Sequence, residues 1–141
     1  MSGVVPHRAR VRLSPGRRLL ALLAVAVARR LARKPPARIR AILARLSRGA
    51  RPATYAQARA ARRTVVAVSL HCAGDQGCLP RSLATVLLCR AQGTWPAWAV
   101  GVRARPPFAA HAWVEAEGRM VEEEADPSYF RALFSVPAVK R

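Results

Sequence analysis

The N-terminal half of this chain lacks acidic residues. Residues 1–74 contain 17 lysines and arginines and no aspartate or glutamate, and the first carboxylate is Asp75. Residues 75–141 contain 8 basic and 7 acidic residues, so the net charge of +18 is concentrated in the first half. Such a charge distribution attracts an anionic partner: a nucleic acid, a membrane surface, or an acidic peptide or protein.

Aromatic residues are also scarce in the basic half. Tyr55 is its one aromatic side chain, so nucleic-acid bases have little to stack on. The half also lacks helix-turn-helix and zinc-finger spacing. We therefore do not expect a nucleic acid as the partner, and we interpret the arginines as the outer faces of helices that dock another molecule.

Long apolar runs are absent as well. Residues 19–28 form the most apolar stretch, about ten residues, which is too short to cross a bilayer. Arg29 and Arg30 follow at once, and a secretory signal rarely tolerates charges there. We expect a docking helix and a cytoplasmic protein, with membrane-surface contact as a less favoured alternative.

Cysteines are few, and their spacing suits neither disulfides nor a metal. The chain has three cysteines, an odd number, and no two of them form a CxxC pair: Cys72, Cys78 and Cys89. This argues against a disulfide framework and against a structural zinc site. A reduced protein with one reactive thiol and no metal is the expectation.

Helix signals fill the first two thirds of the chain. Ser14 and Pro15 open a helix that is expected to run to about residue 34. Further helices are expected from Pro36 to about residue 48, over residues 53–70 and over residues 78–92, with a loop over residues 70–77. In the third helix, Arg59, Arg62 and Arg63 are expected to face solvent.

Alternating patterns follow the helices. Strands are expected over residues 95–103, 109–116 and 119–124, with a short helical or irregular tail after Pro127. The sequence therefore predicts an α+β fold: N-terminal helices, then an antiparallel sheet packed on the helix that begins with Cys78. We divide the chain into a basic helical region, residues 1–64, and a core domain, residues 65–141.

Cys78 is the best candidate for the reactive thiol. It lies at the start of a predicted helix, where the positive end of the helix dipole favours a thiolate, and Arg81 one turn later adds to that field. Cys89, in mid-helix beside Leu88, is expected to be a core residue. Cys72, in the predicted loop, stays ambiguous.

His111 is the candidate base. It lies in a predicted strand between Ala110 and Ala112, small residues that leave room for the helix of Cys78 to approach. A cysteine at a helix start followed by a histidine in a strand is how papain-like and transglutaminase-like folds bring a thiol and an imidazole together.

Turn chemistry suggests the third residue. A three-residue turn closed by a bulge at Gly118 would place Glu115 opposite Arg119 and Glu123 opposite His111, where a carboxylate would orient the imidazole.

Alternatives to Glu123 stay open. A two-residue turn would place Glu124 opposite His111 instead, and Asp126 is a further candidate. For the oxyanion hole, the backbone N–H of Cys78 is the natural first donor and Gln76 a candidate second donor.

Around these residues the chain resembles the lasso-peptide leader peptidases, which are transglutaminase-like cysteine peptidases. The resemblance covers roughly residues 65–135. Its matching segments are CLPRSLA at residues 78–84, residues 99–103, residues 107–115, and Gly118-Arg119 with Val121.

The resemblance implies removal of the leader from a ribosomally made precursor peptide. A separate small leader-binding protein and a cyclase would be the partners. It assigns Cys78 as the nucleophile and His111 as the base, with Glu123 where the family often has aspartate. ATP is associated with some members, but the chain has no phosphate-binding loop, and we expect no cofactor.

Two other functions remain as alternatives. A transglutaminase-like acyl transferase would form the same thioester and pass the acyl group to an amine instead of water. A basic nucleic-acid-binding module would bind with a steep dependence on salt and without need of Cys78.

Overall fold

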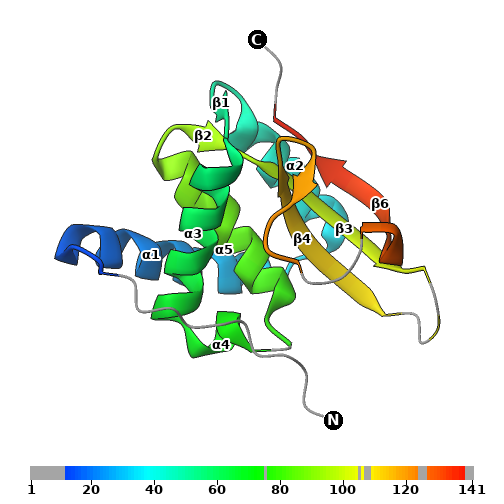
Figure 1. The fold of residues 1–141 in the computed structure, drawn as a ribbon, viewed down its shortest axis with the longest axis horizontal. Coiled ribbons are helices and arrows are strands. Elements are labelled where there is room, and N and C mark those ends of the chain that lie inside the picture. The colour runs from blue at the N-terminus through cyan, green and yellow to red at the C-terminus, as the bar shows by residue number, and fades with distance from the viewer. Residues whose placement is uncertain (1–11, 75, 105, 107–108, 124–126, 139–141) are drawn as a thin grey trace.

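The computed structural model describes residues 12–74, 76–104, 106, 109–123 and 127–138. The expected α+β fold is confirmed: helices come first and an antiparallel sheet follows (Figure 1). The helices are α1 (Pro15–Leu31), α2 (Pro36–Ser47), α3 (Tyr55–Val68), α4 (Leu70–Ala73) and α5 (Cys78–Ala91). The strands are β1 (Arg51–Pro52), β2 (Thr94–Trp95), β3 (Ala97–Arg103), β4 (Ala110–Ala116), β5 (Arg119–Met120) and β6 (Phe130–Val136).

The helix starts follow the capping signals of the sequence. The Ser14 hydroxyl accepts a hydrogen bond from the Arg17 backbone N–H at 3.2 Å, and Pro15 is the first residue of α1. Thr54 and Gln57 form a reciprocal capping box at the start of α3. In the described part of the chain, no helix is long and apolar enough to cross a membrane.

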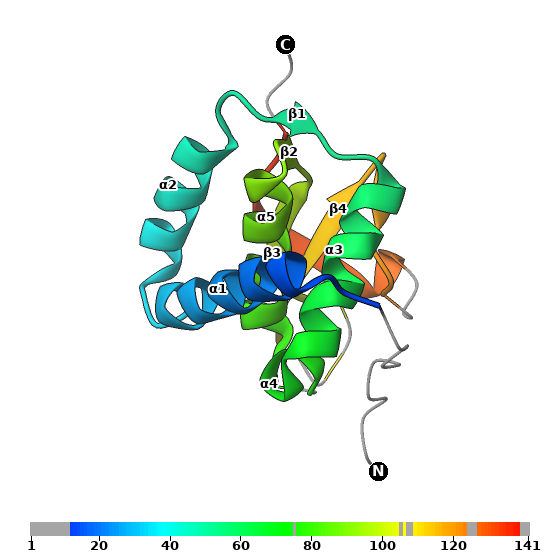
Figure 2. The same ribbon diagram turned by 90° about the vertical axis from the view of Figure 1, so that its left-hand side faces the viewer.

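Helix α5 lies at the centre of the molecule. α1 and α3 pack against it, and the sheet contacts it as well (Figures 1 and 2). A single hydrophobic core runs from Ala21 in α1 to Val136 in β6, with Trp95 and Trp98 fully buried within it. The basic helices and the sheet therefore bury their apolar faces against one another.

The main sheet has the strand order β5-β4-β3-β6, and its neighbouring strands are antiparallel. β3 is the inner partner of both β4 and β6, so β6, the last of the described strands, forms one edge of the sheet. A short parallel pair, β1 with β2, forms a separate two-stranded sheet. Pro96 separates β2 from β3, where one continuous strand was expected.

The turn between β4 and β5 differs from the expected one. Ala116 pairs with Arg119 and Glu115 with Met120, so the turn has two residues and the expected three-residue register is wrong. Glu117 and Gly118 both have positive φ, 54° and 72°, as the two central residues of a type I′ turn require. The two-residue connection matches the twist of the strands better than a type I turn does.

Three further expectations are corrected. Residues 70–77 contain the helical turn α4, which the Ser69 hydroxyl caps through the Cys72 N–H, where a loop was expected. The strand expected over residues 119–124 ends at Met120. The tail after Pro127 contains a 3₁₀ turn (Pro127–Tyr129) and then β6, a full strand of the sheet.

Arg62 is the residue whose environment differs most from the expected one. It was expected to face solvent, but it is 8% exposed, while Arg59 and Arg63 are exposed. It lies where α3 meets the segment after β5, so its side chain points into the molecule and contacts a carboxylate there.

Candidate active site

Cys78 is the first residue of α5, as the sequence predicts. Its side chain is partly buried, and the N-cap residue Gly77 offers no side chain to the free N–H groups of the helix. Position 77 requires glycine, because a Cβ there would collide with the His71 carbonyl group. The tight turn thus places the thiol beside unpaired backbone donors at the positive end of the helix.

His111 lies in β4 within hydrogen-bonding reach of Cys78. The thiol and the imidazole share a hydrogen bond, and the backbone of Ala112 makes a second one to the thiol. β5 pairs only with residues 115 and 116 of β4, and the Val121 N–H adds one further bond to the Val114 carbonyl. β5 is so short that it does not cover the N-terminal half of β4 on this side. The start of α5 approaches β4 there instead.

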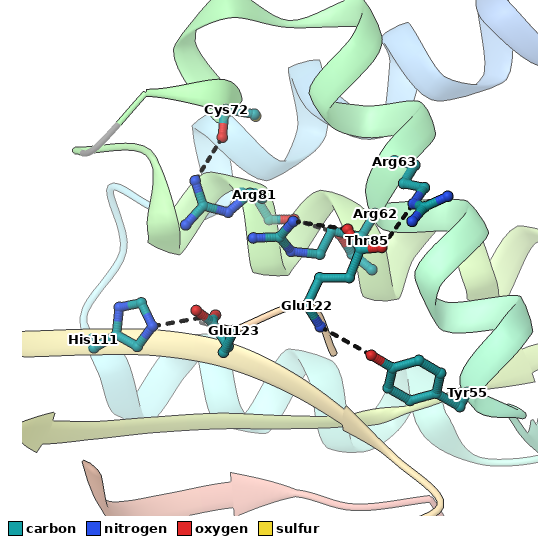
Figure 3. A network of polar contacts seen from close by, with 9 residues as sticks. All are labelled: Tyr55, Arg62, Arg63, Cys72, Arg81, Thr85, His111, Glu122 and Glu123. Carbon is teal, nitrogen blue, oxygen red and sulfur yellow. Dashed lines mark hydrogen bonds and ion pairs between the residues drawn. The ribbon is translucent and has the colours of Figure 1, made fainter. Parts of the chain in front are cut away.

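Glu123 is a further partner of the imidazole. Its Oε1 lies 3.2 Å from His111 Nε2, and the two side chains are 13% and 18% exposed (Figure 3). The contact does not come from a cross-strand pair: Glu122 has a φ of 50°, which turns the chain out of the ladder just before Glu123. Glu124 and Asp126, the alternative acids, lie outside the described residues.

The electrostatics favour a thiolate–imidazolium pair. Burial opposes charge on both groups, but the hydrogen bonds and charges between them outweigh it. The pKa of the Cys78 thiol falls below its usual value, because hydrogen bonds from His111 and the Ala112 backbone, with the charges of His111 and Arg81, overcome the effect of burial. The pKa of His111 rises to about 9 through its hydrogen bonds and charge interactions with Cys78 and Glu123.

Arg81 fixes the turn that precedes the cysteine. It is 8% exposed, and its Nη1 donates a hydrogen bond to the carbonyl oxygen of Cys72 at 2.9 Å (Figure 3). It donates from the same Nη1 to the carbonyl oxygen of Gly74 at 3.3 Å. Its backbone N–H also bonds the Gly77 carbonyl in the first turn of α5. Arg81 therefore contacts both the beginning of the segment that leads into Cys78, at Cys72 and Gly74, and its end, at Gly77.

The bend at Glu122 is held by α3. Arg63 Nε lies 2.7 Å from Glu122 Oε1 and Arg62 Nη1 lies 3.6 Å from Oε2, while the Glu122 N–H donates to the Tyr55 hydroxyl at 3.3 Å (Figure 3). Burial, and then the nearby charge of Arg81, lower the pKa of Arg62. By holding Glu122, the basic helix α3 thus fixes the position of the next residue in the chain, Glu123.

Sequence reasoning did not find Phe130. Its ring stacks on the imidazole of His111 with centroids 4.6 Å apart, and Trp113 stacks on His111 from 5.8 Å. Phe130 comes from β6, which was not expected as a strand, so no pattern linked it to the site. Sequence reasoning also missed the buried position of Arg62 and the hydrogen bonds of Arg81 to the preceding carbonyls.

Gln76, Cys89 and Cys72 are the other candidates that the sequence offers. Gln76 is exposed in the turn before Cys78, and the described residues include no partner for its side chain. Cys89 is fully buried, as expected for a core residue, and burial raises the pKa of its thiol to about 12. Cys72 is also fully buried, and burial raises its pKa. Among the described residues, no group of three or more His, Cys, Asp or Glu side chains could hold a metal ion.

Comparison with known protein families gives a match. A family model described as the transglutaminase-like superfamily matches residues 21–135, which is most of the chain. No curated protein and no solved structure matches. The matched region includes α1, α2 and α3 as well as Cys78, His111 and Glu123.

Proposed function

Since the chain belongs to the transglutaminase-like superfamily, we propose that it is a cysteine peptidase that removes the leader from a ribosomally synthesised lasso precursor peptide. The observation that carries the proposal is the series of interacting side chains Cys78, His111 and Glu123, with Cys78 as the first residue of a helix. A thiol, an imidazole and a carboxylate in that order are the components of thiol-based acyl transfer.

In this mechanism the Cys78 thiolate attacks the carbonyl carbon at the leader–core junction. The helix N-terminus, with the Cys78 N–H as first donor, stabilises the oxyanion. The scissile C–N bond breaks as the His111 imidazolium gives its proton to the departing amine of the core peptide. His111 then removes a proton from water, which attacks the thioester and releases the leader as a carboxylic acid. Glu123 orients the imidazole and stabilises its charged form.

The choice of a leader as substrate is supported by the resemblance of residues 78–84, 99–103 and 107–115 to lasso-peptide leader peptidases. A small leader-binding protein would present the precursor, and a cyclase would join the freed amine to an acidic side chain. The basic N-terminal half has the charge to bind an acidic partner or leader.

The test is cleavage of full-length precursor by the chain together with the leader-binding protein, followed by intact-mass analysis. Wild type should give two products whose masses sum to precursor plus one water. Cys78→Ala should give none, while its circular dichroism remains that of wild type. Cleavage by the folded Cys78→Ala protein would refute the proposal.

The superfamily match also favours a second candidate, acyl transfer to an amine. Both reactions form the same thioester, and only the second nucleophile differs. With a small primary amine present, a transferase would give a leader fragment heavier than the free acid by the mass of the amine minus water. A peptidase would give the free acid.

A further inference from the structure

Helix α1 has two apolar faces, and the described residues cover only one of them. The inner face is buried in the core against α5 and α3 and consists of Ala21, Ala24, Val25, Ala28 and Leu31. The outer face carries the α1 stripe, which we define as Leu19, Leu22, Leu23 and Val27, each 42–59% exposed. In Figure 2, α1 lies across the front of the molecule with its outer side open.

Folding does not explain the α1 stripe. Of the seven large hydrophobic residues that are exposed in the described part of the chain, four belong to this one helix. They recur at the spacing of a single helix face. Alanine, lysine or arginine would support the helix about as well as leucine does. Exposed apolar residues gathered on one face mark a contact surface, whereas scattered ones need no explanation.

The charges around the α1 stripe restrict what can cover it. Arg30 continues the line of Leu23 and Val27, and further exposed arginines flank the stripe at both ends: Arg17, Arg18, Arg29 and Arg33. No acidic residue occurs within residues 1–74. A second copy of the chain would bring the same positive charges into contact, so charge disfavours a homodimer here.

A lipid surface fits less well than an acidic protein. Anionic lipids would match the charge, but α1 has no aromatic residue of the kind that anchors interfacial helices. Arg30 also interrupts the line of apolar residues. Its guanidinium would pair with a carboxylate, which a protein partner can supply. The occupant should therefore have apolar side chains with acidic residues beside them.

We propose that the α1 stripe is the docking surface for the protein that carries the leader of the precursor. The inference rests on the proposed function and adds to it the surface that receives this partner. α5 connects the two sites, because it packs against α1 and begins with Cys78. A partner bound on the outer face of α1 would therefore contact the helix that packs directly on α5, whose N-terminus carries Cys78.

The experiment measures the affinity of the full chain for the leader-binding protein encoded with it, by isothermal titration calorimetry in a Cys78→Ala background. Leu23→Gln/Val27→Gln and Arg30→Glu should each weaken binding by about tenfold or more, since the first removes apolar area that the partner would bury and the second reverses the charge of an arginine in the contact. The matched controls are Leu133→Gln, an exposed leucine on β6, and Arg59→Glu, an exposed arginine on α3. Both should stay within about twofold of the parent affinity.

Folding and site integrity are followed separately. In chains that retain Cys78, the rate of its alkylation by iodoacetamide should be the same in stripe variants and wild type. Vesicles containing phosphatidylglycerol should not sediment the chain through the α1 stripe, and sedimentation equilibrium should show no dimer that Leu23→Gln/Val27→Gln dissociates.

Several results would overturn the inference. The inference fails if the parent chain does not bind the leader-binding protein, or if the stripe variants and the control variants change the affinity equally. It also fails if the stripe variants abolish binding to vesicles or dissociate a dimer. If Cys78-dependent cleavage persists in any of these cases, only the docking surface is refuted. If binding depends on the stripe but Cys78→Ala cleaves normally, only the proposed function is refuted.

Discussion

The protonation states of Cys78 and His111 depend on each other. The imidazolium stabilises the thiolate and the thiolate stabilises the imidazolium, so the pKa of the thiol is lowered and that of His111 is raised to about 9. The ion pair exists between those two pKa values. Activity should therefore rise with pH as the thiol ionises and fall as His111 loses its proton near pH 9.

Glu123→Gln should move the alkaline limb of that profile to lower pH. The carboxylate raises the pKa of His111 by charge and by hydrogen bond, and the neutral amide removes the charge contribution. We expect kcat/KM to fall by roughly a hundredfold. The check is a pH–rate profile beside Glu117→Gln, which changes an exposed carboxylate at the hairpin turn. An unmoved alkaline limb would exclude Glu123 as the residue that stabilises the imidazolium.

Phe130→Leu should weaken catalysis by removing the ring that stacks on His111. Aromatic pairs contribute about 0.5–1.5 kcal/mol beyond area burial, which corresponds to a loss of roughly 2- to 10-fold in kcat/KM. Phe134→Leu is the matched control, since that ring packs on Trp98 and has no ring contact with the imidazole. Equal losses in the two variants would indicate general destabilisation of β6 and no specific role for Phe130.

Among the elements, α5 and the short segment before it determine where the thiol lies. α4, the turn at Gly74 and the N-cap Gly77 are linked to Arg81 by two hydrogen bonds to carbonyl oxygens and one from its backbone N–H. Arg90 makes a comparable contact near the other end of α5, donating from Nε to the Leu46 carbonyl at 2.6 Å. Substitutions of Arg81 and Arg90 can therefore separate an effect on the position of the thiol from an effect on the stability of α5.

Arg81→Lys keeps the charge but replaces the long planar guanidinium, whose Nη1 donates to two carbonyl groups, with a shorter ammonium. We expect it to lower stability by about 1–3 kcal/mol, because buried acceptors lose their donor, and to lower kcat more than it raises KM. Arg90→Lys should also cost stability but leave kcat unchanged. Denaturant unfolding and steady-state kinetics on both variants test this, and a similar fall of kcat in Arg90→Lys would contradict a positioning role for Arg81.

The sequence predicted the elements that carry the thiol and the imidazole because both have local signals: a helix start at Cys78 and a strand pattern around His111. Glu123 was chosen from a three-residue turn, whereas the turn has two residues and the bend at Glu122 brings Glu123 to the site. That bend depends on contacts with α3, which local patterns do not encode. β6 was missed because exposed Leu133 interrupts its alternation of apolar and polar residues.

In the whole molecule, the basic helices and the sheet are parts of one core. Ala21 and Ala28 of α1 are fully buried, and the cluster they belong to includes Leu83 of α5 and Val136 of β6. The division at residue 64 therefore separates regions of different charge, but both regions contribute side chains to the same packed interior.

A fragment of residues 65–141 should consequently fail to fold alone. It would leave the α5 surfaces that contact α1 and α3 exposed to water, and a fragment this short has little core to offset the loss. The full chain should show a cooperative thermal transition by circular dichroism, and the fragment should show none. A cooperative transition in the fragment would mean that the N-terminal helices are an accessory to an autonomous domain.

The place of β6 in the sheet has a consequence for biosynthesis. The strand that stacks Phe130 on His111 leaves the ribosome after β3 and β4, so it can pair with β3 only after both of them have been made. A nascent chain therefore contains Cys78 and His111 before it contains the ring that packs on the imidazole. Activity at Cys78 should therefore appear only after β6 has been made and has paired with β3.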